Sequence, residues 1–263
     1  MIKYKTDHLV IFESSLYRTN SVLVISDFQT MLIDPNWLPM EVREIQQHFL
    51  AHQVGRKSYC VFTHADYDHV IAWKAFDVEV TIASHGISDP NRKSMVLEEI
   101  YTFDESYYIQ RDYPIRYPVP DVSVEGKTAI DFGNENVVFT CCEGHSPDDM
   151  MIFFAQRGLW VVGDYLSNIE LPLIDYDINA YYKSLQLFEE LINDAKPRML
   201  IPGHGDYTED VGEMRRRLDF SHEYLKALQS GDETRVEKLI DSLPFKREQL
   251  KIHKRNQDRM TMT

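Results

Sequence analysis

One hexapeptide constrains this chain more than any other feature. His64-Ala65-Asp66-Tyr67-Asp68-His69 holds four potential metal ligands, and it follows an apolar run at residues 59–62 that is typical of a buried strand. Two imidazoles and two carboxylates this close together repel or desolvate one another unless a cation neutralises them. The pattern therefore predicts half of a two-metal site on a loop at the end of a strand.

Three later sites share one construction, in which a His or an Asp follows a hydrophobic run and lies beside glycine. They are His145 in Glu143-Gly144-His145-Ser146-Pro147, Asp164 in Val161-Val162-Gly163-Asp164, and His204 in Ile201-Pro202-Gly203-His204-Gly205-Asp206. Glycine lets the backbone take positive φ and approach a bound species closely. Catalytic groups of α/β folds tend to lie at strand ends that share one edge of a sheet. Each site alone is typical of an ordinary loop, but the ordered set predicts one common site.

The ordered set of motifs resembles that of the metallo-β-lactamase superfamily of hydrolases, and the resemblance covers nearly the whole chain. The motifs are, in order, H-x-D-x-D-H, G-H-S-P, G-D and P-G-H-G. Residues 20–24 and 31–35 are similar to the opening strands of that family. The resemblance implies an α/β fold, a four-layer αββα sandwich. It also implies that the first of two metal ions is bound by His64, Asp66 and His145, and the second by Asp68, His69 and His204, with Asp164 bridging the two.

Position 66 departs from the family pattern, because the family usually has a His where this chain has Asp66. A carboxylate adds negative charge and a hard oxygen donor, which favours manganese or iron over zinc. Relatives with a carboxylate at this position include nuclease-like domains of DNA-uptake proteins and the diiron flavoproteins. Residues 70–72 and Asp148 also stand where the family commonly has glycine. These changes bear on the metal and the substrate more than on the fold.

The resemblance implies two divalent ions, zinc, manganese or iron, as cofactors. A pair of ions about 3.5–4 Å apart generates a bridging hydroxide near neutral pH and polarises the substrate oxygen. Asp68 can orient that water or take its proton. Tyr165, directly after Asp164, can offer its O–H to a developing oxyanion, although an aromatic residue at a strand end more often serves packing. Asp68 and Tyr165 are therefore the predicted catalytic residues.

Composition bears on the class of protein and its partners. A net charge of −14 argues against an extended nucleic-acid surface, which needs clustered Lys and Arg.

The cysteines and the N-terminus bear on where the protein works. Cys60, Cys141 and Cys142 lie in apolar runs and are expected to be buried free thiols, which fits a reducing cytoplasm. No apolar run approaches about 18 residues, and residues 1–8 show no secretory signal, so no membrane span is expected. We expect a cytoplasmic protein with a small-molecule substrate, and a homodimer is an option.

Strand-like runs and helical patterns alternate along the chain, which favours an α/β fold. Strands are predicted at 9–12, 22–25, 31–33, 78–83, 137–142, 151–155 and 159–162. Apolar spacing predicts helices at 39–49, 179–193, 208–229 and 246–259, and one more that is capped by Asp232. We predict a single metallo-β-lactamase-like domain over residues 1–263, with a helical C-terminal tail from about residue 208.

Two further features stand outside that pattern. The Tyr- and Pro-rich stretch at 101–120 is expected to be a lid or a dimer contact, or else an ordinary surface excursion. His85, just after the predicted strand at 78–83, can lie near the site. The other histidines lack neighbouring ligands and are expected to be structural or exposed.

The residues leave more than one function open. A dinuclear hydrolase of an ester, lactone, thioester, β-lactam amide or phosphodiester has the full ligand set in its favour. The apolar loop at 167–177 mildly favours an uncharged or partly apolar substrate. A diiron redox or oxygen-binding protein has Asp66 in its favour, but it would need an electron donor in trans because no flavin domain is attached. A non-catalytic metal-binding domain is the third alternative.

Overall fold

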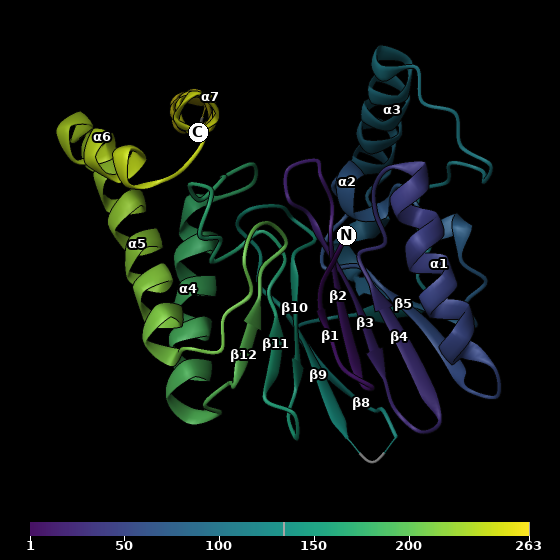
Figure 1. The fold of residues 1–263 in the computed structure, drawn as a ribbon. Coiled ribbons are helices and arrows are strands. Elements are labelled where there is room, and N and C mark those ends of the chain that lie inside the picture. The colour runs from purple at the N-terminus through teal and green to yellow at the C-terminus, as the bar shows by residue number, and fades with distance from the viewer. Residues whose placement is uncertain (134, 263) are drawn as a thin grey trace. The chain divides into compact units, whose positions relative to one another are not determined.

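The computed structural model describes residues 1–133 and 135–262. The chain divides into two compact units, Met1–Cys141 and Cys142–Thr263. Figure 1 labels most of the helices and strands of both units. Among the helices of the described residues, none combines the length and the apolar character that a membrane span requires.

The first unit is built on a seven-stranded sheet in the order β1-β2-β3-β4-β5-β6-β7. Its antiparallel part consists of β1 (Ile2–Lys5), β2 (Leu9–Glu13), β3 (Asn20–Ile25) and β4 (Gln29–Ile33). Its parallel part continues from β4 through β5 (Lys57–Val61), β6 (Val80–Ser84) and β7 (Val122–Val124). A separate antiparallel pair is formed by β8 (Lys127–Asp131) and β9 (Asn136–Cys141). Because β4, β5 and β6 are parallel, the segments that follow them leave from the same edge of the sheet.

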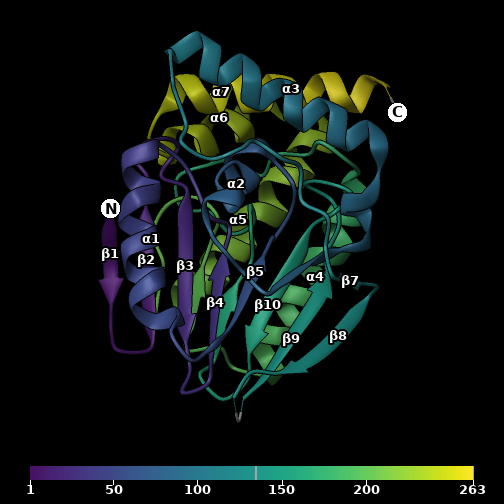
Figure 2. The same ribbon diagram turned by 90° about the vertical axis from the view of Figure 1, so that its right-hand side faces the viewer.

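Helix α1 (Pro39–Gln53) confirms the helix predicted to begin at Pro39 and continues beyond the predicted end. Its buried Val42, Ile45 and Phe49 lie on one face and join a core with the sheet. Figure 2 shows α1 alongside the strands of this unit. The hexapeptide at residues 64–69, the metal motif, begins in the loop after β5 and ends inside the short helix α2 (Tyr67–Val70). The 3₁₀ helices η1 (Trp73–Ala75) and η2 (His85–Ser88) follow α2.

Helix α3 (Pro90–Tyr107) was not predicted, and it takes in the first part of the Tyr- and Pro-rich stretch. Residues 108–121 form neither helix nor strand. Arg111 anchors them, because its guanidinium donates to Asp104 at 2.8 Å twice and to the carbonyl oxygen of Trp37 at 2.7 Å. This segment and the end of α3 line a cavity of about 510 Å³. A role as a lid or a dimer contact stays a prediction.

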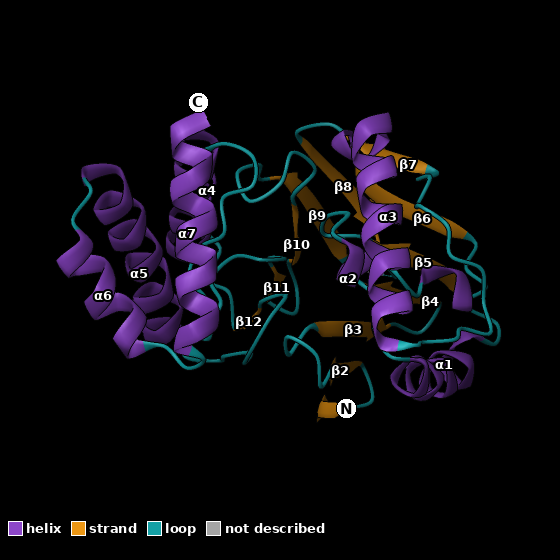
Figure 3. Cartoon of the chain, turned by 90° about the horizontal axis from the view of Figure 1, so that it is seen from above, coloured by secondary structure: helices purple, strands orange, loops and turns teal. Residues whose placement is uncertain are grey.

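The second unit holds β10 (Met150–Phe154) antiparallel to β11 (Leu159–Val161), and β12 (Met199–Ile201) parallel to β11. Its helices are α4 (Ile178–Asp194), α5 (Val211–Ser230), α6 (Glu233–Ser242) and α7 (Lys246–Met262). Figure 3 shows these four helices next to one another. The apolar face of α4 packs into the core of this unit through Leu185, Phe188 and Ile192.

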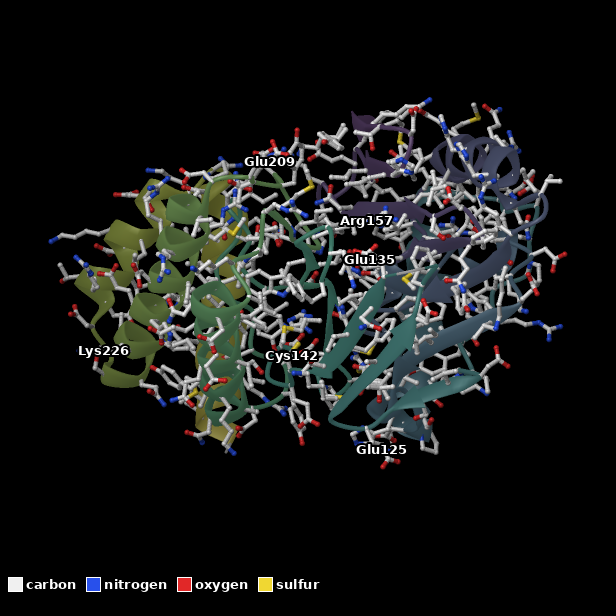
Figure 4. All side chains as sticks on the ribbon, turned by 90° about the horizontal axis from the view of Figure 1, so that it is seen from below. Glu125, Glu135, Cys142, Arg157, Glu209 and Lys226 are labelled. Atoms are coloured by element: carbon white, nitrogen blue, oxygen red, sulfur yellow. The ribbon has the colours of Figure 1, made fainter. Side chains whose placement is uncertain are left out.

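The helix ends of the second unit follow capping chemistry. The carboxylate of Asp210 accepts from the Gly212 N–H at 2.7 Å, so α5 begins after it, three residues later than predicted. Gly231 closes α5 with φ +67°, and Asp232 caps α6 as predicted by accepting from the Arg235 N–H at 3.1 Å. The polar face of α5 is solvated, as the exposed Lys226 illustrates in Figure 4.

Candidate metal centre

The metal motif places two imidazole–carboxylate pairs in the first unit: His64 and Asp66 in the loop after β5, as predicted, and Asp68 and His69 in helix α2 rather than in a loop. The Nε2 atom of His64 lies 3.7 Å from Oδ2 of Asp66, and the Nε2 atom of His69 lies 3.6 Å from Oδ2 of Asp68. His64, Asp68 and His69 are buried, whereas Asp66 is partly exposed. Nitrogen and oxygen donors at this separation are close enough to share an ion, and each pair belongs to a larger group of candidate metal ligands.

One buried carboxylate, that of Asp34, orients the imidazoles of His64 and His69. Asp34, directly after β4, accepts from the Thr63 hydroxyl and lies 3.0 Å from Nδ1 of His69. The Thr63 hydroxyl oxygen in turn lies 3.1 Å from Nδ1 of His64. Because Thr63 gives its proton to Asp34, it accepts from His64, and both rings carry their proton on Nδ1. The Nε2 lone pairs are therefore directed at the positions that Asp66 and Asp68 face.

The two acidic ligands of the metal motif have partners of their own. The Thr19 hydroxyl donates to Oδ2 of Asp68 at 3.2 Å, and Trp37 Nε1 donates to the same hydroxyl at 3.2 Å. Oδ1 of Asp66 accepts from Nη2 of Arg92, a buried residue of α3. Both carboxylates are held in one orientation.

The second unit gathers His145, Asp164 and His204 from three separate turns. Oδ2 of Asp164 lies 3.6 Å from Nε2 of His145 and 3.2 Å from Nε2 of His204. A backbone hydrogen bond from Gly203 N to Gly163 O, at 2.6 Å, joins the turns that carry Asp164 and His204. One carboxylate oxygen between two imidazole nitrogens is the arrangement that a bridging ligand needs.

The turn that carries His145 depends on a glycine. Gly144 has φ +146°, and a Cβ atom there would lie 2.4 Å from Cα of Tyr181 in α4. No side chain larger than hydrogen fits against the start of α4 without displacing it. Ser184 adds a tether by donating to the carbonyl oxygen of Glu143 at 2.7 Å.

Tyr165 is fully buried in the second unit, and its hydroxyl contacts the turn that carries His145. The hydroxyl accepts from the His145 N–H at 3.0 Å, and it faces the Cys142 carbonyl oxygen at 2.6 Å and Oδ2 of Asp149 at 2.8 Å. Burial raises the pKa of this phenol, so its single proton stays on the oxygen and goes to one of those two acceptors. This geometry favours a role in positioning His145, and donation to an oxyanion stays a prediction.

The loop at 167–177 fixes the ring of His145 and is itself held by α7. The carbonyl oxygen of Leu173 lies 3.2 Å from Nδ1 of His145, which places the ring proton on Nδ1. Asn256 accepts from the Ile174 N–H at 2.8 Å and donates to the Pro172 carbonyl oxygen at 2.7 Å. Gln249 pairs in the same way with the N–H of Leu171, at 2.9 Å, and the carbonyl oxygen of Ile169, at 2.8 Å. The C-terminal helix therefore supports a candidate ligand.

The apolar residues of this loop pack inward. Leu166, Leu171 and Ile174 belong to the core of the second unit and are at most 2% exposed. Their apolar character is thus explained by core packing, and it no longer supports an uncharged or partly apolar substrate. A hydrophobic loop can serve the core as well as a pocket, so the class of substrate stays a prediction.

Other predicted residues are more peripheral. His85 is exposed at the start of η2, and within residues 1–133 and 135–262 it belongs to no group of candidate metal ligands. His253 is buried between Tyr224 and Glu233, in keeping with a structural role. All three cysteines are free; Cys60 and Cys142 are buried as predicted, whereas Cys141 is partly exposed.

Two residues of the site were missed in the sequence. Asp34 follows β4 directly, which is the pattern that identified Asp164 after β11, so that signal was present. Arg92 had no signal, because only the packing of an unpredicted helix brings it to Asp66.

A family comparison decides the class of this chain. Residues 15–215 match the family model of the metallo-beta-lactamase superfamily. The chain belongs to this superfamily. Its predicted fold class, α/β with two sheets in the αββα metallo-β-lactamase-like arrangement, is confirmed. No curated protein matches the chain.

Solved structures of the superfamily share the fold at low sequence identity. A metallo-β-lactamase family protein from Thermus thermophilus has 14% identity and a TM-score of 0.64, over 86% of this chain and 82% of that chain. The BLEG-1 B3 metallo-β-lactamase has 18% identity and a TM-score of 0.59, over 81% and 99%. A stereoselective inverting sec-alkylsulfatase from Pseudomonas sp. has 16% identity and a TM-score of 0.62, over 90% and 43%.

Members of the superfamily are mostly metal-dependent hydrolases with dinuclear sites, typically of zinc. The donor set of this member fits divalent ions, since it offers only imidazole nitrogens and carboxylate oxygens. The imidazoles of His64, His69 and His145 carry their proton on Nδ1. A neutral imidazole that binds a metal through Nε2 must have its proton there.

Proposed function

We propose that the protein binds two divalent metal ions through these candidate ligands, and that it is a metal-dependent hydrolase of a small-molecule ester, lactone, thioester or phosphodiester. One observation carries the proposal: all four imidazoles present Nε2 to a carboxylate oxygen of their own unit, at 3.2–3.7 Å. The Nε2 atom of the structural His253 also faces a carboxylate, but within the described residues His253 belongs to no group of candidate metal ligands, whereas each of these four imidazoles does.

The ligands divide between the two ions as the family pattern implies. The first ion takes His64, Asp66 and His145, the second takes Asp68, His69 and His204, and Asp164 bridges them. The contacts of Asp164 support this division, because its Oδ2 lies near Nε2 of one imidazole from each set.

The ions would supply an activated water and polarise the substrate oxygen. Asp68, whose Oδ2 accepts from the Thr19 hydroxyl, would orient this water and hold the proton that is released. Tyr165 keeps the backbone of His145 in place. The ligand environment is buried around His64, His69 and His145, which strengthens the electrostatic interactions there.

We expect the protein to be cytoplasmic, to act on a small-molecule substrate and to bind no extended nucleic acid. The net charge of −14 supports the last point, since a polyanion would be repelled. A homodimer remains an option for the oligomeric state.

The test combines metal analysis with a panel of esters, lactones, thioesters and phosphodiesters. We expect turnover of at least one class by the wild type, and loss of both bound metal and turnover in Asp164→Ala. The exposed Asp194 provides a matched control as Asp194→Ala. Retention of metal and turnover in Asp164→Ala would remove Asp164 from the bridging role. Two irons with an oxygen-sensitive visible band, and no turnover, would support the diiron alternative that Asp66 favours.

A further inference from the structure

An ion pair between the buried Arg92 and the partly exposed Asp66 lies where the chain departs from its family. Arg92, in the first turn of α3 and 7% exposed, donates from Nη2 to Oδ1 of Asp66. The other oxygen of the same carboxylate, Oδ2, faces Nε2 of His64 at 3.7 Å. The two oxygens of Asp66 are thus divided between a guanidinium and the position of the first metal ion.

The packing of α3 builds this pair into the fold. Val96 and Ile100 of α3 are buried in the core of the first unit. The ring of Phe103, further along α3, lies 6.1 Å from the ring of Tyr67, which directly follows Asp66. Helix α3 is therefore packed on the metal motif itself, and it brings Arg92 to Asp66 at a fixed place.

Charge explains what the pair achieves. A guanidinium is always protonated, so Arg92 can be buried at low cost only beside an anion. Asp66 and Arg92 together are formally neutral, as is the imidazole that the family usually has at position 66. The pair therefore replaces a neutral nitrogen donor by an oxygen donor of a hard carboxylate without changing the formal charge of the ligand set.

We infer that Arg92 is a positioning residue that makes Asp66 a single-oxygen, charge-compensated ligand, and that positions 66 and 92 together set which metal the first site prefers. This inference rests on the proposed function. It implies that a His at position 66 binds metal better when Arg92 is also removed, because the guanidinium would otherwise lie near a cation without the carboxylate of Asp66 between them.

The test is a double-mutant cycle read by calorimetric titration of metal-free protein with zinc. Asp66→His alone is expected to bind zinc at least about tenfold more weakly than Asp66→His combined with Arg92→Met. Circular dichroism of each metal-free variant checks the fold. A coupling between the two positions below about threefold overturns the inference.

A second comparison keeps Asp66 and does not depend on the histidine variants. Arg92→Met removes the guanidinium from Oδ1 of Asp66, so the ratio of manganese to zinc affinity is expected to rise at least about tenfold. Arg92→Lys keeps the charge and should leave that ratio within about threefold of the wild type. The neighbouring exposed Lys93 supplies the matched control, Lys93→Met. Equal ratios in the Met and Lys variants would overturn the inference.

The wild-type titration distinguishes a failure of the proposed function from a failure of the inference about Arg92. If the wild type binds neither zinc nor manganese, the proposed function and the inference both fail. If it binds two ions and the variants show no coupling, only the inference about Arg92 fails.

Discussion

Oδ2 of Asp34 lies 3.0 Å from Nδ1 of His69, and the same oxygen accepts from the hydroxyl of Thr63. Oδ1 of Asp34 accepts from the Thr63 N–H at 2.8 Å. A single buried carboxylate thus sets the proton position of His69 directly, and that of His64 through Thr63. The readiness of the first unit to bind metal depends on a residue that is itself not a candidate ligand.

Asp34→Asn should weaken metal binding by about 10–100-fold, because its amide nitrogen can donate to Nδ1 of His69 and move the ring proton to Nε2. Calorimetric titration with zinc measures the loss. Asp27→Asn, at an exposed position between β3 and β4, is the control and should leave the affinity unchanged. Wild-type affinity in Asp34→Asn would show that this carboxylate does not orient the ligands.

Gly144→Ala should destabilise the protein by about 2–4 kcal/mol, since a Cβ at φ +146° meets the Tyr181 backbone at 2.4 Å. Gly55→Ala is the comparison, because Gly55 has φ +74° and nothing within 4 Å of the added atom. It should cost about 1 kcal/mol, from backbone conformation alone. Urea unfolding measures both, and similar losses in the two variants would contradict the close approach to α4.

The Asn256 side chain is hydrogen-bonded to the Ile174 N–H, the Pro172 carbonyl oxygen and the Tyr224 hydroxyl. Asn256→Ala removes these three hydrogen bonds. A loss of about 2–4 kcal/mol is expected, since each buried polar group left unsatisfied costs about 1–3 kcal/mol. Hydrogen exchange at the Ile174 amide should accelerate in parallel. Lys254→Ala, on the exposed face of α7, should change neither quantity. Unchanged exchange in Asn256→Ala would argue against α7 as the support of this loop.

Alkylation should separate the cysteines. Burial and the nearby charge of Asp34 raise the pKa of the Cys60 thiol. Since only the thiolate reacts, Cys60 should stay unmodified as the pH rises from 7 to about 9, while the partly exposed Cys141 is modified. Mass spectrometry of the native protein reads the sites, with urea-unfolded protein as the control in which all three react. Early modification of Cys60 would contradict its burial.

The raised pKa of Cys60 also predicts how the free energy of unfolding changes with pH. The thiol ionises at a lower pH in the unfolded chain than in the folded one. Its contribution to the free energy of unfolding is therefore fully present below the unfolded pKa and is lost as the pH rises above it. The free energy of unfolding should therefore fall on the alkaline side, and less so in Cys60→Ala than in the wild type.

The sequence was most informative where chemistry and strand ends coincide. His64, Asp164 and His204 could be identified because each follows a short apolar run, and those runs are the strands β5, β11 and β12. Helix α1 was predictable from the spacing of Val42, Ile45 and Phe49. These features are local, and local periodicity records them.

The remainder depends on contacts between distant segments. Arg92 meets Asp66 from a helix 26 residues away, and Asn256 meets Ile174 across 82 residues. The short exposed strand β8 carries too weak an alternation to be predicted, because its burial alternates between exposed and intermediate positions. Such pairings are decided by packing, which a single sequence does not record.

The most direct measurement is elemental analysis of the purified chain, followed by titration of metal-free protein, for the wild type, His69→Ala and His204→Ala. Our account predicts two divalent ions in each wild-type chain, and loss of at least one ion in either variant. A wild type that takes up no ion, or variants that both retain two ions at wild-type affinity, would contradict the proposed dinuclear site.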